Sequence, residues 1–281
     1  RANLRCGALD AAQAAPIVEA AAELRDGRFD GHFPLTVWQT GSGTQTNMNA
    51  NEVIANRANE LLGQPLGTKS PVHPNDHVNA SQSSNDSFPT VMHIATALEL
   101  RERLRPALQL LRQRLQERAE AFADVLKIAR THLMDAVPMT LGQSFDAFAR
   151  QVGHGIDRID ATFARLQLLA QGGTAAGTGL NAPPGFDAGL CEELGALCGI
   201  AFAPNPSKFE GMASHDALVE VSGALNVLAA SLVKMANDLR LLGSGPRCGL
   251  GELRIPDDGL TSSIMPGKRN PTIAEVVVQA G

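Results

Sequence analysis

Residues 208–242 read KFEGMASHDALVEVSGALNVLAASLVKMANDLRLL, and this stretch decides the fold class. Its apolar residues recur at alternating spacings of three and four, a repeat that one face of a long α-helix produces. At 1.5 Å per residue, the helix would be about 50 Å long. Helices of this length are typical of helical bundles. The repeat consists of Leu218, Val221, Leu225, Leu228, Leu232, Met235, Leu239 and Leu242.

Two other segments carry the same kind of repeat. One contains Phe145, Phe148, Val152, Ile156, Ile159, Phe163 and Leu166, and the other contains Leu104, Leu108, Leu111, Leu115 and Phe122, despite Pro106. Small residues on the other helix faces favour close packing against further helices and oligomerisation. No strand alternation is evident. The sequence therefore predicts an all-α protein built on a bundle of long helices.

Long polar segments separate these helices, at residues 34–90, 171–186 and 243–272. The first of them contains a helical piece near 49–62. Loops this long are usually functional or disordered. They also disfavour the alternative of a plain coiled-coil rod.

Composition and charge disfavour several classes of protein. The chain of 281 residues is long enough for a full core, and its net charge of −5 disfavours a nucleic-acid binder. No C-x-x-C pair occurs among the four cysteines, so we expect reduced thiols and no zinc or iron–sulfur site. We find no window of about 18 apolar residues and no signal core at the N-terminus, so we expect a cytoplasmic protein without a membrane span.

Four polar segments could together hold a small dianion. They combine hydroxyl and amide donors with a lysine and a histidine, all of which can bind a carboxylate. The segments are residues 261–272 (TSSIMPGKRNPT), 40–47 (TGSGTQTN), 81–86 (SQSSND) and 130–132 (RTH).

Each segment also has a plainer interpretation. Residues 41–43 (GSG) form no P-loop, since no G-K-[ST] follows. They are either a tight turn or, with Ser42, Thr44 and Asn47, a cradle for a carboxylate. Residues 83–85 (SSN) favour the N-terminus of a helix, where they could also present donors to an anion.

The titratable residues are similarly open to two interpretations. His132 is either a hydrogen-bonded structural histidine or a group that polarises a water. Glu275 is the first acidic residue after the 261–272 loop and could orient an imidazole. His73 stands beside a proline turn, where a surface histidine is the commoner interpretation. A loop such as 268–270 (KRN) is often only solvated.

The chain resembles the fumarase/aspartase superfamily, and within it the class II fumarate hydratases. The 262–270 loop fits the superfamily signature S-S-x-M-P-x-K-x-N. The narrower resemblance is carried by TGSGTQTNMN at 40–49, HPNDHVNASQSSND at 73–86, RTHLMDA at 130–136 and GPRCG at 245–249. Aspartate ammonia-lyases are similar too, but they usually carry Gln at the position of His132.

The resemblance implies reversible anti addition of water to fumarate, giving L-malate, without metal or other cofactor. It implies that Ser262 is the base that removes the C3 proton, and that His132, paired with Glu275, handles the water. The implied substrate-binding residues are Ser42, Thr44, Asn47, Ser83, Ser84, Asn85, Thr131, Lys268 and Asn270. A second dicarboxylate site is implied at His73, Asn75 and Asp76.

The resemblance also implies a homotetramer in which three subunits build each active site and the central helices are shared. Family chains are longer at both ends. We therefore expect residues 1–80 to be part of an N-terminal domain truncated at its start. Residues 81–281 would be a central bundle domain truncated at its end, without the small C-terminal domain.

Three departures from the family pattern stand out. Thr261 replaces a glycine before the paired serines, and Arg269 replaces a small apolar residue. Ser70 and Pro71 replace a basic pair beside the second site. Two alternatives remain open: an amine-releasing lyase such as aspartate ammonia-lyase, and an inactive helical assembly protein. A processed mitochondrial enzyme is the alternative to a cytoplasmic one.

Overall fold

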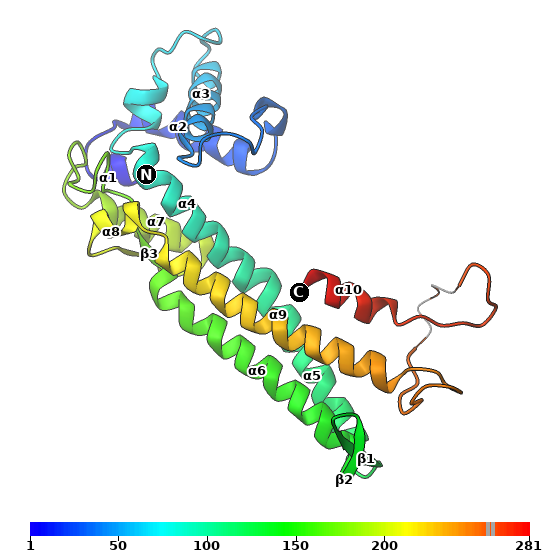
Figure 1. Ribbon diagram of the computed structural model, residues 1–281. Helices are drawn as coiled ribbons and strands as arrows, with labels where there is room; N and C mark the ends of the chain where they lie inside the picture. The colour runs from blue at the N-terminus through cyan, green and yellow to red at the C-terminus, as the bar shows by residue number, and fades with distance from the viewer. Residues whose placement is uncertain (257–258, 260–261) are drawn as a thin grey trace. The chain divides into compact units, whose positions relative to one another are not determined.

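The computed structural model describes residues 1–256, 259 and 262–281, so Thr261 lies outside the described residues. The chain divides into two compact units. The first unit contains Arg1–Leu98 and Phe163–Leu218, and the second contains Glu99–Thr162 and Val219–Gly281. The helices and strands of each unit carry the labels of Figure 1.

The first unit contains short and medium helices and one small parallel strand pair, β3 with β4. The last residue of α4 belongs to the second unit. The elements are α1 (Ala2–Arg5), α2 (Ala11–Arg25), η1 (Asp30–His32), α3 (Thr44–Leu61), η2 (Pro74–Val78), α4 (Ser84–Glu99), β3 (Leu168–Leu169), α7 (Phe186–Cys198), β4 (Ala203–Pro204) and α8 (Lys208–Ala213).

Helices α2 and α3 pack against each other through small side chains. Ala20 of α2 meets Ala55 and Ala58 of α3, together with Val72 from the loop that follows. All four are buried. Because alanine keeps two helix backbones close, the 40–47 segment that leads into α3 has a rigid support.

The second unit is the helical bundle with one antiparallel hairpin, β1 with β2. The last turn of α6 and the first residues of α9 belong to the first unit. The elements are η3 (Leu100–Leu104), α5 (Arg105–Ala121), β1 (Leu126–Thr131), β2 (Met134–Thr140), α6 (Leu141–Leu166), α9 (Asp216–Leu242) and α10 (Thr272–Ala280).

The predicted seams pack this bundle. Phe148 and Val152 of α6 are buried, as are Leu228 and Met235 of α9. A Cβ on Gly155 of α6 would lie only 2.9 Å from a methyl of Leu228, so the two helices are in close contact. Their side-by-side course is visible in Figure 1. The all-α bundle prediction is thus confirmed.

Proline at position 106 does not interrupt the third seam, because it stands in the first turn of α5. The proline nitrogen carries no hydrogen, and the first turn of a helix needs no donor there. The π-turn η3 precedes it and joins α5 to the preceding helix.

Two predictions about secondary structure were wrong. The 208–242 repeat is not one helix, because Ser214 is extended (φ −124°, ψ 147°) and separates α8 from α9. Strands also exist, since residues 126–140 form the β1–β2 hairpin. His132 and Leu133 form its two-residue turn with φ of +54° and +64°. A non-glycine pair with positive φ lacks the N-G signal that usually marks such a turn in a sequence.

Helix α9 also corrects the expectation about apolar windows. Among the described residues, it alone is long and apolar enough to cross a membrane. Only 11% of its 18-residue apolar window is buried. Core helices of soluble proteins are also long and apolar enough to cross a membrane. The exposed apolar face of α9 is therefore equally suited to packing against other helices.

Candidate functional site

A chain of hydroxyl groups joins the 40–47 segment to the start of α4 in the first unit. Thr40 Oγ1 lies 2.9 Å from Ser42 Oγ, which lies 3.3 Å from Thr44 Oγ1. Thr44 Oγ1 lies 3.0 Å from Ser84 Oγ. Gly43 allows this approach: its φ is +71°, and a Cβ there would overlap the ring of Phe88. The structure thus brings the predicted Ser42, Thr44 and Ser84 together.

The first turn of α4 presents further donors. Ser83 caps the helix, because its Oγ accepts from the Asn85 backbone N–H at 3.2 Å. The Asn85 side chain is exposed and its Nδ2 donates to the Ala175 carbonyl at 2.9 Å. Unpaired backbone N–H groups and the helix dipole at this end attract anions. Capping and anion binding are therefore compatible here.

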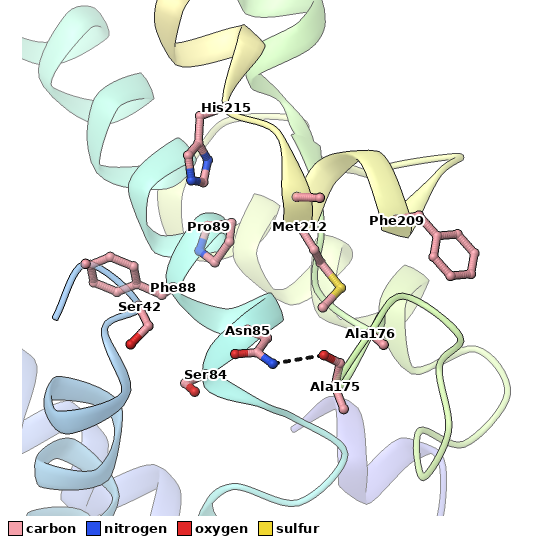
Figure 2. A pocket seen from close by; sticks show the side chains of 12 residues that line it. Ser42, Ser84, Asn85, Phe88, Pro89, Ala175, Ala176, Phe209, Met212 and His215 are labelled. Atoms are coloured by element: carbon pink, nitrogen blue, oxygen red, sulfur yellow. Dashed lines mark hydrogen bonds between the residues drawn. The ribbon is translucent and has the colours of Figure 1, made fainter.

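Ser42, Ser84 and Asn85 open onto a pocket of about 350 Å³. Figure 2 shows Ser84 and Asn85 at the start of α4 and Ser42 on the neighbouring loop. The rest of the wall is mainly apolar, with one imidazole. It consists of Gly41, Phe88, Pro89, Ala175, Ala176, Phe209, Met212, Ala213 and His215.

The Asn47 amide bonds to another asparagine and not to the hydroxyl chain. Its Nδ2 donates to Asn79 Oδ1 at 3.2 Å, an atom that also accepts from buried Asn51 at 3.1 Å. Trp38 lies on the same loop, four residues before Ser42, with 92% of its surface exposed. The 34–43 segment therefore carries a large solvent-exposed aromatic side chain, Trp38, close in sequence to the hydroxyl groups.

His73, Asn75 and Asp76 meet on one turn, at the start of η2. His73 Nδ1 accepts from the backbone N–H groups of Asn75 and Asp76, each at 3.2 Å. The Asp76 carboxylate lies 3.3 Å from the same ring nitrogen. These bonds use Nδ1 for the turn, and Asn75 and Asp76 remain exposed.

In the second unit, the hairpin tip carries the exposed residues Thr131 and His132. Strand β1 is tied to the 243–256 segment by Glu252. The Glu252 carboxylate forms ion pairs with Arg130 and, at 3.3 Å, with Lys127. Burial opposes ionisation of Glu252, but the two cations still hold its pKa below the ordinary value. His132, which has a positive φ, therefore lies on a hairpin that is held by ion pairs. Backbone strain of this kind clusters at functional sites.

The Ser262 hydroxyl accepts two backbone hydrogen bonds. The N–H groups of Ile264 and Met265 donate to Ser262 Oγ at 3.3 Å and 3.2 Å. Lys268 and Asn270, farther along the loop, line a cavity of about 1230 Å³ that includes Arg240 and Arg247. The loop thus provides two backbone donors for the Ser262 hydroxyl. A few residues later it also lines a cavity that carries positively charged side chains.

Glu275, in the first turn of α10, forms its ion pair with Arg240 of α9 at 3.6 Å. Arg240 also donates to Asn237 Oδ1 at 2.9 Å. The pairing of Glu275 with His132 stays a prediction. It also stays a prediction that the donors of residues 40–47 and 83–85 share one site with Ser262, Lys268 and Asn270.

Sequence reasoning missed Asp86, Glu252 and Arg240. Asp86 had a signal, because Ser83 and Asp86 are spaced as a capping box. Glu252 and Arg240 had none, since their partners lie far along the chain. Among the described residues, no cluster of three or more His, Cys, Asp and Glu side chains could hold a metal ion.

Comparisons with known proteins agree on one family. A family model described as "Lyase" matches residues 1–281. The chain is 58% identical over 279 residues to "Fumarate hydratase class II" of Rhizobium meliloti, covering 99% of this chain and 60% of that relative. It is 59% identical to "Fumarate hydratase, mitochondrial" of Schizosaccharomyces pombe, covering 96% and 52%.

A solved structure gives the same picture. The class II fumarase of Schistosoma mansoni superposes with a TM-score of 0.97 at 43% identity, covering 99% of this chain and 61% of that one. The chain therefore spans little more than half the length of the proteins that it matches.

Proposed function

This chain belongs to the lyase family, and on that premise we propose that it catalyses the reversible hydration of fumarate to L-malate as part of a class II fumarate hydratase. Relatives named as fumarate hydratases, at 58% and 59% identity, favour hydration over the release of an amine. His132, where ammonia-lyases usually carry Gln, favours it too. The domain division at residues 80 and 81 is part of the same proposal.

The single observation that carries the proposal is the environment of the Ser262 hydroxyl. An ordinary serine is a poor base and needs help to ionise. The N–H groups of Ile264 and Met265 donate to its oxygen and would stabilise the alkoxide. In the dehydration of L-malate to fumarate, Ser262 removes a proton from C3, and the hydroxyl on C2 leaves as water after it accepts a proton. His132, supported by Glu275, handles that water.

Proton removal next to a carboxylate leaves a dianionic aci-carboxylate. Fixed donors that meet the extra charge stabilise the transition state more than the substrate. The donors we assign come from the hydroxyl chain, the start of α3, the first turn of α4, the tip of the β1–β2 hairpin and the loop that follows Ser262. They are Ser42, Thr44, Asn47, Ser83, Ser84, Asn85, Thr131, Lys268 and Asn270. His73, Asn75 and Asp76 form the second dicarboxylate site.

The proposed assembly is a homotetramer in which three subunits contribute to each site, as the resemblance to the fumarase/aspartase superfamily implies. The proposed compartment is the cytoplasm or the mitochondrion, since relatives of both bacterial and mitochondrial description are similar. We assign no nucleic-acid partner, membrane partner or cofactor.

The test is the ultraviolet absorbance of fumarate after L-malate is added to the purified chain. We expect a rise that stops at an equilibrium mixture. Ser262→Ala should lower kcat by at least about 100-fold, because the reacting base is lost. The matched control is Ser263→Ala, which removes the neighbouring exposed hydroxyl and should retain most of the turnover.

Two outcomes would count against the proposal. Turnover by Ser262→Ala at the wild-type rate would remove the serine from the role of base. Fumarate released from L-aspartate but not from L-malate would replace hydration with amine release.

A further inference from the structure

The Asp86 side chain is fully buried and accepts hydrogen bonds on both oxygens. Oδ1 accepts from the Ser83 backbone N–H at 2.9 Å, with the Ser87 hydroxyl at 3.4 Å. Oδ2 accepts from the backbone N–H groups of Thr174 at 2.7 Å and Gly172 at 3.1 Å. Burial raises the pKa of Asp86, and the three backbone donors act in the opposite direction.

Helix capping explains only one of the three backbone hydrogen bonds. The bond to Ser83 completes a capping box at the start of α4. The other two bonds reach 86 and 88 residues along the chain, to a turn that takes no part in the helix. A carboxylate that served only the cap would not need them. Oδ2 therefore has a separate task, which is to hold the 172–175 turn.

This turn has a backbone that needs support. Thr174 is buried and has a φ of +55°, which is uncommon for a residue other than glycine. Gly172 has a φ of +92°, and a Cβ there would lie 2.8 Å from Asp187 Cβ. Such conformations persist only where the surroundings determine them. Both of these residues donate their backbone N–H to Asp86 Oδ2.

The turn ends at Ala175, whose carbonyl accepts from Asn85 Nδ2 at 2.9 Å. Figure 2 shows this bond at the wall of the pocket, next to Ser84. A carbonyl oxygen can only accept, so the amide of Asn85 must face it with nitrogen rather than oxygen. The second hydrogen of the same NH₂ group is then available as a donor. An amide free to rotate would offer its oxygen to an anion as often as its nitrogen.

We propose that Asp86 is a positioning residue, which holds the 172–175 turn so that the Ala175 carbonyl orients the Asn85 amide as a donor for a carboxylate. The identity of the ligand, a four-carbon dicarboxylate, rests on the proposed function. The positioning itself rests on the hydrogen bonds and is independent of turnover.

The first experiment needs no substrate. In the wild-type chain labelled with ¹⁵N at asparagine, one of the two side-chain NH₂ protons of Asn85, the one donated to the Ala175 carbonyl, should exchange with water more slowly than the NH₂ protons of an exposed asparagine. Equally fast exchange of both Asn85 protons in the wild type would overturn the proposal. In Asp86→Ala the N–H groups of Gly172 and Thr174 lose their acceptor, so the turn is released and the slow exchange of the Asn85 proton should be lost.

The matched control is Ser87→Ala, which removes the longest contact to Asp86 and leaves all three backbone donors. It should keep the slowly exchanging Asn85 proton. Circular dichroism establishes that each variant is folded, and Asp86→Ser, which also lacks the Oδ2 oxygen for the turn donors, takes the place of Asp86→Ala if that variant does not fold. A slowly exchanging Asn85 proton in a folded Asp86 variant would overturn the proposal, as would its loss in Ser87→Ala.

Kinetics separate positioning from a general loss of structure. In an active wild-type protein, Asp86→Ala should raise KM for fumarate about tenfold and change kcat less than threefold, because a binding donor is lost and the base is retained. An equal loss of kcat at unchanged KM would contradict the proposal. A wild-type chain without turnover would refute the proposed function and leave the Asn85 measurement valid.

Discussion

The Asn59 side chain pairs with both backbone groups of Val72, as a neighbouring strand would. Its Nδ2 donates to the Val72 carbonyl at 2.8 Å, and its Oδ1 accepts from the Val72 N–H at 2.9 Å. Both residues are buried. The side chain thereby satisfies a main-chain segment that enters the α2–α3 core and leads to His73.

Truncation of this side chain should be costly. Asn59→Ala leaves a donor and an acceptor of Val72 buried without partners, and each such group costs about 1–3 kcal/mol. We expect a loss of about 2–4 kcal/mol in the free energy of unfolding, measured by urea denaturation. Asn56→Ala, one turn earlier on α3, breaks the bond to the exposed Gly67 N–H and should lose less than half as much.

At this scale, the sequence predicted local chemistry well and distant chemistry poorly. Ser83 as a helix cap follows from its own type and its neighbours. The partners of Asp86 do not, because they lie 86 and 88 residues away and are backbone groups of no particular residue type. A side chain that bonds to a distant main chain leaves no signature in the spacing of residues.

At the scale of elements, an ion pair joins α2 to α3. Arg57 donates to both carboxylate oxygens of Glu23, at 2.5 Å and 3.0 Å, and Arg28 adds a third bond at 2.9 Å. These contacts, with Arg57 the largest contributor, lower the pKa of Glu23 below its ordinary value of 4.5. A lowered pKa in the folded state means that the pair stabilises the protein at pH above 4.5. The contribution is lost as the pH falls through the lowered value.

Glu23→Gln should therefore lower the melting temperature at pH 7. The difference from the wild type should shrink as the pH is reduced below 4.5, because both proteins then carry a neutral side chain. Thermal unfolding followed by circular dichroism at pH 7, 5, 4 and 3 measures it. Glu19→Gln, on the exposed face of the same helix, is the control. A difference independent of pH would show that packing, not charge, joins the two helices.

The elements were predicted in proportion to the strength of their periodicity. The seams of α6 and α9 gave the bundle, since an apolar repeat sustained over several turns is typical of packed helices. The β1–β2 hairpin was missed because its turn, His132 and Leu133, contains no glycine or asparagine. The break at Ser214 was missed because the spacing of apolar residues does not show that two residues between α8 and α9 leave the helical conformation.

At the scale of the whole molecule, the proposed tetramer requires a surface to assemble on. Helix α9 has such a surface, because Val219, Val227 and Leu241 are exposed on a helix that is apolar for most of its length. Covering them removes apolar area from water, at roughly 25 cal/mol per Å². The family relationship could be predicted from the sequence, whereas the assembly has no signal beyond small and apolar residues on several faces.

Val227→Lys should weaken the assembly, because a buried charge without a partner is unfavourable. Sedimentation velocity at several protein concentrations should show a shift from oligomer to smaller species. Gln116→Lys, which adds the same charge to an exposed position of α5, should leave the distribution unchanged. A wild-type chain that remains a monomer at all concentrations would contradict a site built from three subunits.

Trp38 is the chain's sole tryptophan, and it stands exposed on the loop of Ser42 and Thr44. Intrinsic emission excited at the red edge of the absorption band is therefore a signal from one place. In an isolated chain the indole is in water, and its emission lies at long wavelength. Any neighbour that settles on this loop, whether another copy or a ligand, changes the polarity around the ring. Trp38 is thus an intrinsic fluorophore close to the hydroxyl groups, and binding of a ligand or a second copy at this loop can be followed without a label.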